Sequence, residues 1–347
     1  MAATRLGFFL PGELEAREPP EARGVARDGV RMMATFRCSG AIVHSHFHAL
    51  PDFLSAGDLV VINTSQTIPA EVDAESISGR RCVVHFSTEI ADDFWVVEPR
   101  RRDGKRSVEW SDEDPPASVL FVADGGTIEL LEHFPESTRL YLARVTLPMP
   151  VHRWLTTRGR PIQYGYLDRE WPLAAYQNTY ANEPGSATMP SAGRPLTPAL
   201  VTRLVAQGIG VSPVVLHTGV ASLGADELPY PERVVVPRST ANRVNATRRE
   251  GGRVIAIGTT VVRALESAVG RFGYAEEFDD WAGAVITPDR PARVVDGIVT
   301  GWHEPEASHL LMLEAIAGRD LLERAYDEAV RAGYLFHEFG DSHLVMP

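Results

Sequence analysis

The sequence predicts an α/β protein in which a mixed-sheet α/β domain carries an inserted small antiparallel β-barrel domain. Between residues 65 and 147, short alternating runs of apolar residues are separated by turn sequences, which is typical of a small barrel or sandwich. After Pro148, strand-like and helix-like segments alternate, which favours an α/β domain. We therefore expect a discontinuous α/β domain of residues 1–64 and 148–347, and a barrel of residues 65–147.

Length and composition set the broad class. A chain of 347 residues can bury a sizeable core and form two domains. No apolar run is long enough to cross a membrane, and the first residues lack the apolar core of a secretory signal. Cys38 and Cys82 cannot form a disulfide framework or, by themselves, a metal cluster. We expect a cytoplasmic protein with no membrane association.

The net charge of −12 argues against nonspecific binding of nucleic acid, which needs clustered Lys and Arg. One segment departs from this balance, because Pro99–Arg106 holds five basic residues in eight positions. Gly104 marks a turn within it. Composition alone favours a solvated hairpin tip, whereas a local basic face could contact nucleic acid.

The N-terminal part contains two expected strands, Ala41–Phe47 and Leu59–Ile62. His44, His46 and His48 alternate along the first, so a strand places all three on one face. Because the apolar residues of this run would face the core, we expect an exposed or edge face for the histidines rather than a zinc site.

The barrel segment contains seven expected strands, and no good long helix interrupts them. They are Ile68–Val72, Arg81–Phe86, Phe94–Val97, Ser107–Trp110, Val119–Val122, Thr127–Leu131 and Leu140–Val145.

Helix signals follow in the second half. Thr197 can cap a helix that has Pro198 at its first position and Gly208 after its end. A strand is expected at Gly210–Leu216 and another at Val294–Thr300. Two helices are expected last, near Glu306–Ala317 and Leu321–Ala332, and Asp320 with Glu323 resembles a capping box for the second.

The segment Arg253–Glu266 predicts a strand, a tight turn and a helix. Val254–Ile257 is apolar, Gly258 allows a sharp turn, and Thr259 or Thr260 can cap the helix. Such a unit presents free amides and a positive dipole end to an anion, although an ordinary capped helix has the same pattern.

Polar residues follow three of the expected strands. His217 and Thr218 follow one, Gly258–Thr260 another, and Gly301–Pro305, with His303, the third. Ligands of open α/β sheets bind beyond the carboxyl ends of strands, so we expect His217, Thr259, Thr260 and His303 around one crevice. A fourth segment, Tyr176–Gly193, is rich in small residues and suits either a ligand loop or a rigid surface loop. Nucleophile-elbow, Walker and dinucleotide-binding motifs do not occur in the sequence.

Several ordered motifs together resemble one known family, the S-adenosylmethionine:tRNA ribosyltransferase-isomerases of queuosine biosynthesis. The motifs are Asp58–Ala70, Tyr176–Ala181, Pro184–Ala187, Pro190–Gly193, Val254–Ser267, Val295–Thr300 with His303 and Pro305, Leu310–Leu313, and Phe339–Ser342. They span nearly the whole chain.

The resemblance implies an α/β catalytic domain with a barrel insertion, and a specific reaction. The family moves the ribosyl part of S-adenosylmethionine onto 7-aminomethyl-7-deazaguanine in tRNA and rearranges it, which gives epoxyqueuosine and releases adenine and methionine. S-adenosylmethionine is then a consumed substrate, so we expect no cofactor and no metal. The expected partners are S-adenosylmethionine and tRNA, and we expect a monomer.

Under this resemblance we assign roles to the polar residues. His217 and His303 are the acid–base candidates, because the sulfonium acidifies the neighbouring ribose carbon, which calls for a base, and a proton donor or hydrogen bonds to its ring help adenine to depart. The methionine carboxylate needs backbone amides or an Arg. The expected substrate-binding residues are Ser186, Ser191, Gly193, Thr218, Gly258, Thr259, Thr260 and Arg263, and the expected tRNA-binding residues are Arg100, Arg101, Arg102, Lys105 and Arg106.

Four segments depart from the pattern of the family, and some of them lie in the expected site. They are Arg194–Thr197, His217–Leu223, Tyr230–Arg233 and Gly301–His303. Two alternatives therefore stay open. One is a divergent paralogue that uses S-adenosylmethionine or a related nucleoside with a non-tRNA acceptor. The other is a non-catalytic protein that binds tRNA or a nucleoside.

Overall fold

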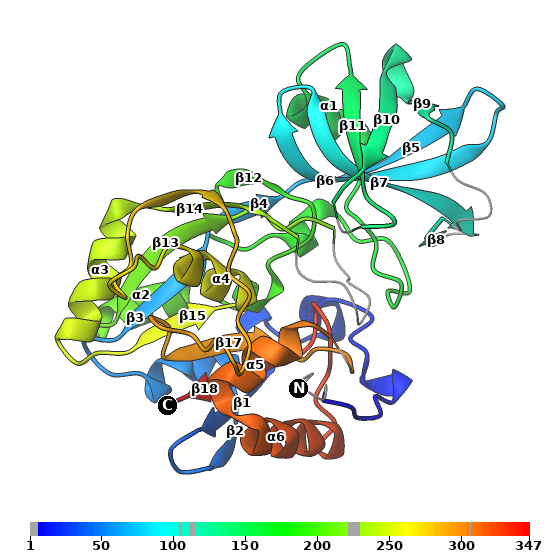
Figure 1. The fold of residues 1–347 in the computed structure, drawn as a ribbon. Coiled ribbons are helices and arrows are strands. Elements are labelled where there is room, and N and C mark those ends of the chain that lie inside the picture. Colours follow the sequence, from blue (N-terminus) through cyan, green and yellow to red (C-terminus); the bar gives the residue numbers. More distant parts are fainter. Residues whose placement is uncertain (1–5, 104–105, 111–115, 136, 221–229, 306) are drawn as a thin grey trace.

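The computed structural model describes residues 6–103, 106–110, 116–135, 137–220, 230–305 and 307–347. It consists of an α/β body and a β-barrel body, which Figure 1 shows below and above, respectively. Both parts of the predicted fold class are confirmed.

The α/β body is built on a nine-stranded mixed sheet in the order β16-β14-β13-β3-β15-β17-β18-β1-β2. Four adjacent strands, β13, β3, β15 and β17, run parallel, and β18 and β1 also pair in parallel. The other neighbours are antiparallel. The bounds are β1 Arg31–Phe36, β2 Ile42–His46, β3 Leu59–Asn63, β13 Gly210–Leu216, β14 Arg233–Val236, β15 Val254–Ile257, β16 Phe278–Trp281, β17 Gly297–Gly301 and β18 Ser342–Met346.

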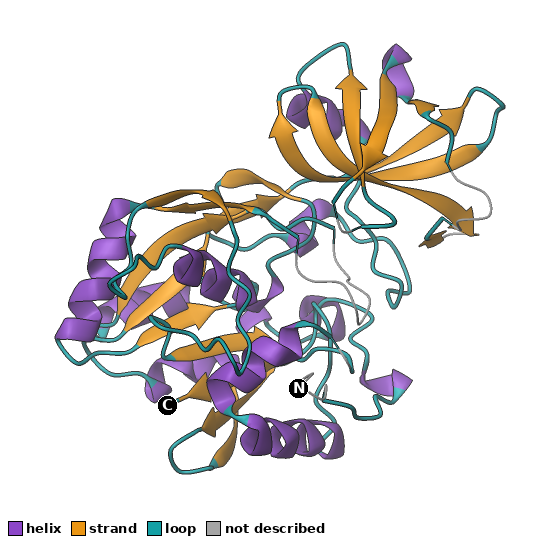
Figure 2. Ribbon diagram, in the orientation of Figure 1, coloured by secondary structure: helices purple, strands orange, loops and turns teal. Residues whose placement is uncertain are grey.

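The central strands are continuous apolar runs because helices cover both faces of the sheet (Figure 2). Successive side chains point to opposite faces, so Val61 joins one hydrophobic cluster and Val60 the other. The first cluster packs against α3 (Arg238–Arg249), α4 (Thr259–Ser267), α5 (His309–Ala317) and α6 (Arg319–Arg331), and the second against α2 (Pro198–Ala206) and the short helix Phe47–Phe53.

The barrel is a closed ring of six antiparallel strands in the order β11-β10-β9-β5-β6-β7, since β11 also pairs with β7. β8 extends β7 as a hairpin. The bounds are β5 Glu71–Ser76, β6 Arg81–Ala91, β7 Phe94–Asp103, β8 Arg106–Val108, β9 Val119–Phe121, β10 Thr127–His133 and β11 Tyr141–Thr146. Phe86 and Trp95 fill its own hydrophobic core, together with Trp154 of α1 (Val151–Arg158).

A two-stranded parallel pair lies where the chain passes between the bodies. β4 (Ser65–Thr67) pairs there with β12 (Glu183–Ser186). Glu71 and Arg160 exchange two backbone hydrogen bonds of 2.9 Å each, which join the start of the barrel to the segment that follows α1. The predicted domain boundaries, 64/65 and 147/148, lie near these transitions and stay predictions.

Most of the expected elements occur, with shifted ends. The Thr197 cap is confirmed, because its hydroxyl accepts the Leu200 amide at 3.3 Å. His44, His46 and His48 are exposed on and beside the edge strand β2, as expected. The strand expected at Ile68–Val72 begins only at Glu71, and that expected at Val294–Thr300 begins at Gly297.

Two capping predictions are wrong. Gly258 is the N-cap of α4 and no side chain caps that helix, because Thr259 already has a helical position. The N-cap of α6 is Gly318, so Asp320 lies inside the first turn, and the Glu323 carboxylate accepts from Arg319 at 2.5 Å instead.

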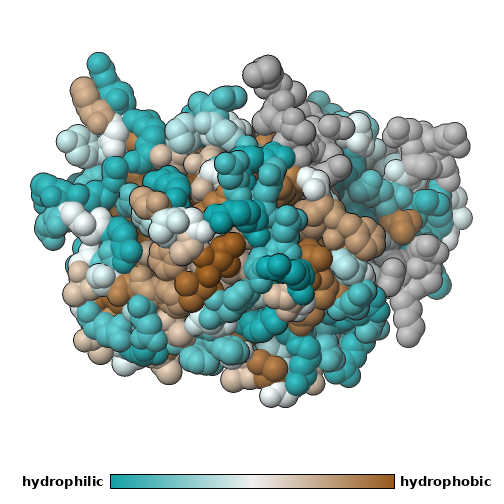
Figure 3. Space-filling view, turned by 90° about the horizontal axis from the view of Figure 1, so that it is seen from below, coloured by the Kyte–Doolittle hydropathy of each residue, from teal (hydrophilic) through white to brown (hydrophobic). Residues whose placement is uncertain are grey.

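Exposed large apolar side chains are scattered over separate elements rather than gathered on one of them. Phe9, Ile77, Val205 and Phe272 are examples. Seen from below, the surface shows apolar groups divided by hydrophilic residues (Figure 3). Among the described residues, none of the helices has the length and apolar character that crossing a membrane requires.

Removing a ring from the barrel core should destabilise the protein strongly. We expect Phe86→Ala to lower the free energy of unfolding by about 3–5 kcal/mol, because the lost ring leaves a cavity in a packed core. The measurement is chemical denaturation. Phe121→Ala is the matched control, because Phe121 is 44% exposed whereas Phe86 is fully buried. Equal losses for both variants would contradict the packing described here.

Candidate functional site

A cavity of about 980 Å³ lies between the strand ends of the α/β body and the barrel wall. Its lining comes from both bodies and from the segments between them. The lining residues include Glu71, His85, Glu98, Arg100, Arg102, residues 162–170 and 188–192, Thr218, residues 258–260 and 300–304, and residues 307–309, 337 and 338.

The ends of three strands meet at this cavity. Thr218 follows β13, Gly258–Thr260 follows β15, and His303 follows β17, and all of them line it. The parallel direction of β13, β15 and their neighbours brings these ends to one edge. Of the residues expected around one crevice, Thr259, Thr260 and His303 are therefore brought together.

His217 lies behind the cavity wall and is not among the residues that line it. Its Nδ1 is 2.7 Å from the Ser65 hydroxyl, which is 2.6 Å from the Ser186 hydroxyl. Burial lowers the pKa of His217 to about 4, so the ring is neutral at pH 7. The geometry gives His217 a part in joining β4, β12 and β13, and its acid–base role stays a prediction.

The segment Tyr176–Gly193 contributes only some of its expected residues to the cavity lining. Ser191 lines the cavity, whereas the buried Ser186 hydroxyl accepts the Thr218 amide at 3.1 Å behind it. Gly193 is needed for packing, because a Cβ there would come within 1.9 Å of the Tyr180 hydroxyl. Ser186 and Gly193 are thus outside the lining.

The N-terminus of α4 opens onto the cavity. Gly258 has a φ of 99°, a conformation that side-chain-bearing residues rarely adopt, and it turns the chain from β15 into the helix. The first-turn amides and the helix dipole favour an anion at this end.

Arg263, one turn further along α4, is not among the lining residues. It forms an ion pair with Glu232 and donates to the Tyr230 carbonyl at 2.9 Å. Glu232 also accepts the Gly219 amide at 2.9 Å. Arg263 therefore fixes the segment after β13, and its predicted contact with the methionine carboxylate stays a prediction.

Neutral histidines face the cavity from the α/β body. The His303 ring stacks on His309 at 4.7 Å, and its Nε2 is 3.0 Å from the Thr300 hydroxyl. Burial places the pKa of His303 well below its usual value and lowers the pKa of His309 to about 4. Both rings therefore offer neutral nitrogen atoms to a ligand at pH 7.

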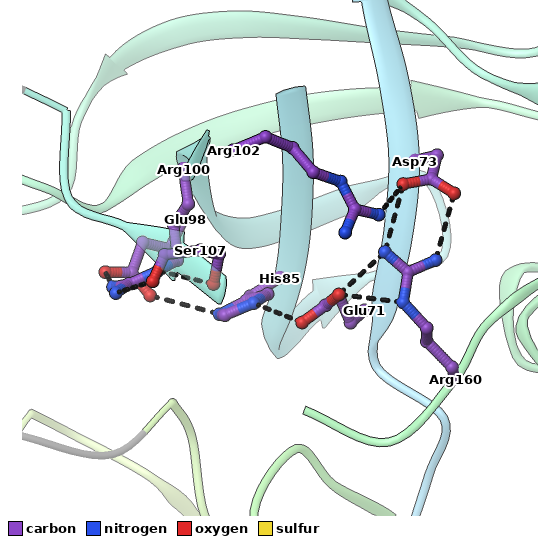
Figure 4. Close-up of polar contacts among 8 residues, drawn as sticks. All are labelled: Glu71, Asp73, His85, Glu98, Arg100, Arg102, Ser107 and Arg160. Atoms are coloured by element: carbon purple, nitrogen blue, oxygen red, sulfur yellow. Dashed lines mark hydrogen bonds and ion pairs between the residues drawn. The ribbon is translucent and has the colours of Figure 1, made fainter. Parts of the chain in front are cut away.

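The barrel wall carries charges instead (Figure 4). His85 lies between two buried carboxylates, with Nε2 3.0 Å from Glu71 and Nδ1 3.4 Å from Glu98. Although burial opposes charge, these carboxylates raise the pKa of His85. Hydrogen bonds and ion pairs lower the pKa of Glu71 and bring that of Glu98 to about 2. Sequence reasoning missed this cluster.

The basic segment Pro99–Arg106 lies partly on the same wall of the cavity. Arg100 and Arg102 alternate along β7 and both line the cavity. Arg100 donates to Glu98 at 2.8 Å and to the Ser107 carbonyl at 3.1 Å, and Arg102 pairs with Asp73.

The other members of the segment are placed less fully. Arg101 is exposed and donates to the Glu109 carbonyl at 3.5 Å. Arg106 contributes its backbone to the β8 hairpin, whereas Lys105 lies outside the described residues. Contact of this segment with tRNA stays a prediction.

Comparison with known proteins identifies the family. The family model described as "Queuosine biosynthesis protein" matches residues 3–345. The chain belongs to the queuosine biosynthesis protein family. This confirms the resemblance that the sequence motifs indicated.

Individual members of the family match along their whole length. The S-adenosylmethionine:tRNA ribosyltransferase-isomerase of Thermotoga maritima is 32% identical over 355 residues, which cover 100% of each chain. That of Geobacter sulfurreducens is 33% identical over 360 residues, covering 99% of this chain and 100% of its own. The solved S-adenosylmethionine tRNA ribosyltransferase from Thermotoga maritima has a TM-score of 0.55 at 27% identity, covering 98% of this chain and 99% of its own.

Further lining residues of this queuosine-family cavity were missed from the sequence. His309, Tyr164, Tyr166 and Glu338 are examples. Glu338 directly precedes the quoted motif Phe339–Ser342, which was a usable signal. Within the described ranges, side chains of the metal-ligating types do not form a group of three or more that could hold a metal ion.

The buried cluster on the barrel wall should make stability depend on pH in a defined direction. The pKa of Glu98 is depressed, so its contribution is present above its usual value of 4.5 and is lost as the pH falls toward about 2. His85 acts oppositely, and its contribution is lost as the pH rises through its raised pKa.

We expect Glu98→Gln to remove most of the loss of stability that occurs at low pH. We also expect it to lower the free energy of unfolding at pH 7 by about 3 kcal/mol, because it leaves buried cations unpaired. Unfolding by denaturant from pH 2 to 7 measures both effects. Glu129→Gln is the control, because Glu129 forms a half-exposed pair with Arg144. It should change neither the stability at pH 7 nor the loss of stability at low pH. An unchanged loss of stability at low pH in Glu98→Gln would contradict the role given to Glu98.

Proposed function

We propose that this chain transfers the ribosyl moiety of S-adenosylmethionine to 7-aminomethyl-7-deazaguanine in tRNA, forming epoxyqueuosine and releasing adenine and methionine. The observation that carries the proposal is the family match over residues 3–345, supported by full-length similarity to proteins named for this reaction. S-adenosylmethionine is then a consumed substrate. We accordingly propose a monomeric cytoplasmic enzyme without a cofactor.

The cavity offers complementary chemistry for the sulfonium substrate. The N-terminus of α4 is suited to the methionine carboxylate, since Gly258, Thr259 and Thr260 line the cavity there. Neutral His303 and His309 offer hydrogen bonds to an uncharged purine without repelling the sulfonium. Of the two predicted acid–base histidines, His303 lines the cavity and His217 does not.

The barrel wall suits the tRNA acceptor. A protein with a net charge of −12 needs a local basic surface to hold phosphates. Arg100 and Arg102 supply positive charge at the cavity, and Arg101 supplies it on the outer surface of the same strand. Binding of the tRNA backbone along β7 would bring the target base to the cavity.

A second candidate is a paralogous enzyme with a non-tRNA acceptor. Ion pairing favours it, because Arg102 is already paired with Asp73 and Arg100 with Glu98. These arginines therefore carry less free charge than their number suggests.

Purified protein with S-adenosylmethionine and tRNA bearing the aminomethyl base should release one adenine for each modified base formed. The measurements are chromatography of adenine and mass spectrometry of the nucleosides. A tRNA with guanine at the same position is the control and should give neither product. Adenine release without a change in the tRNA base would instead favour the non-tRNA acceptor.

Replacing an arginine of the barrel wall should weaken tRNA binding through its charge. We expect Arg102→Ala to raise the Kd for tRNA and to reduce the slope of log Kd against log salt by about 1, because one phosphate contact is lost. Binding at several salt concentrations measures this. Arg144→Ala, which removes another exposed and ion-paired barrel arginine, is the control and should leave the slope unchanged. Equal effects of both variants would remove β7 from the tRNA surface.

A further inference from the structure

One acidic side chain on the cavity wall, Glu338, takes no part in the binding assigned to the α4 N-terminus, the histidines or the arginines. Glu338 lies in the turn His337–Gly340, between α6 and β18, which is closed by a hydrogen bond of 3.0 Å from the Gly340 amide to the His337 carbonyl. Glu338 lines the main cavity and also a small side pocket next to Arg194 and Asp341. It therefore lies at the boundary between the reaction space and the protein interior.

One oxygen of the Glu338 carboxyl group lacks a hydrogen-bond partner. Its Oε2 has no access to solvent and no hydrogen-bond partner among the described residues. Buried polar atoms in folded proteins nearly always have a partner, so an unpartnered one in a residue of the cavity wall calls for a functional explanation. The residue as a whole is only partly buried and lines the cavity, so a ligand bound there is the available partner once the carboxyl group turns toward it.

The charged and titratable groups around Glu338 are committed elsewhere. Arg194 is bound to Glu21 at 2.8 Å, and Arg27 is bound to the same carboxylate at 2.9 Å. Asp341 accepts the Arg31 and Leu335 amides, and the Tyr164 hydroxyl accepts the Met189 amide.

Without a bound cation, burial raises the pKa of Glu338 to about 7. The neighbouring histidines differ, because burial lowers the pKa of His303, His309 and His337. Among these groups, Glu338 is the one suited both to take up and to release a proton near neutral pH.

The backbone before Glu338 is strained. His337 has a φ of 70°, which is uncommon for a residue with a side chain. Its amide donates to the Trp302 carbonyl at 3.0 Å, and its ring stacks on Tyr166 at 4.2 Å with the planes 9° apart. Strained residues held by their surroundings cluster at functional sites. This one fixes the turn that places Glu338 on the cavity wall.

We propose that Glu338 is the proton-transfer group of the ribosyl transfer. Its carboxylate accepts the proton from the ribose carbon bonded to the sulfonium sulfur, and the resulting carboxylic acid protonates the departing adenine. This inference rests on the proposed function and names a residue for its proton transfers.

The two steps balance. In the first, the C–H bond breaks, its electron pair stays on the carbon beside the positive sulfur, and an O–H bond forms on Glu338. In the second, the bond between the ribose and adenine breaks, its electron pair leaves on the adenine nitrogen, and the proton moves from Glu338 to adenine. The positive charge left on the ribose carbon is shared by the ring oxygen. The carboxylate is regenerated, and no oxidant or reductant is required.

The test compares Glu338→Gln with the wild type. Gln keeps the shape of the side chain but cannot accept a proton at neutral pH, so we expect kcat for adenine release to fall at least about 100-fold. The Kd for S-adenosylmethionine, measured by calorimetry, should stay within about threefold of the wild-type value, because it depends on the binding surface and not on proton transfer.

Two further readouts separate proton transfer from a structural role. In deuterated buffer, the wild type should exchange the ribose hydrogen beside sulfur, as measured by mass spectrometry, and Glu338→Gln should not. The kcat of the wild type should change with a midpoint near pH 7, and Glu338→Asp should shift that midpoint. Glu250→Gln, an exposed carboxyl after α3, is the control for charge and should behave as the wild type.

Each outcome decides one question. Retention of wild-type kcat and pH dependence by Glu338→Gln would overturn the assignment of Glu338 while leaving the ribosyl transfer in place. A loss that appears only as weaker binding of S-adenosylmethionine, with exchange retained, would overturn it as well. Absence of adenine release and base modification in the wild type would overturn the proposed function itself, and this inference with it.

Discussion

The parallel alignment of β13, β3, β15 and β17 is the constraint on which the site depends. β3 and β15 at the centre of the sheet are buried between two layers of helices, so their side chains are apolar until each strand nears its end. Because all four strands run in the same direction, the first polar residues after them emerge at a common edge. Thr218, Gly258 and His303 are far apart in the sequence and share a cavity for this reason.

The barrel completes the cavity with a different electrostatic character. On the α/β side, burial without charged partners keeps the rings of His303 and His309 neutral. On the barrel side, His85 is equally buried but lies between two carboxylates, and their attraction outweighs the cost of burial. The pKa of the same residue type is thus shifted in opposite directions on the two walls, because its neighbours differ.

The sequence predicted best those features whose cause is local. Val254–Ile257 and the Thr197 cap depend on a few adjacent residues, and both occur as expected. Features set by distant neighbours were missed. β18 carries His343 in its core, where the ring is bonded to the Thr35 hydroxyl of the adjacent strand, so its sequence lacks a plain apolar pattern. The helix α3 is largely polar and buries few residues.

The candidate site follows the same division. The strand ends could be named because polarity changes abruptly there, but Glu71, His85 and Glu98 look like ordinary polar positions of exposed strands. They meet only because Glu71 is paired with His85, and His85 with Glu98, in the registers of β5, β6 and β7. Register across strands depends on the closed barrel and cannot be obtained from one strand alone.

The paired backbone hydrogen bonds between Glu71 and Arg160 bring together the two ends of the barrel segment. The described residues between 72 and 159 form a closed excursion whose two ends are held at hydrogen-bonding distance, and they supply most of a separate apolar core. Because the ends meet, a short bridge of a few residues can span them without stretching the remaining scaffold, although Ile162, Ala187 and Val220 would lose their apolar neighbours. The sequences of the two cavity walls can therefore diverge independently in evolution.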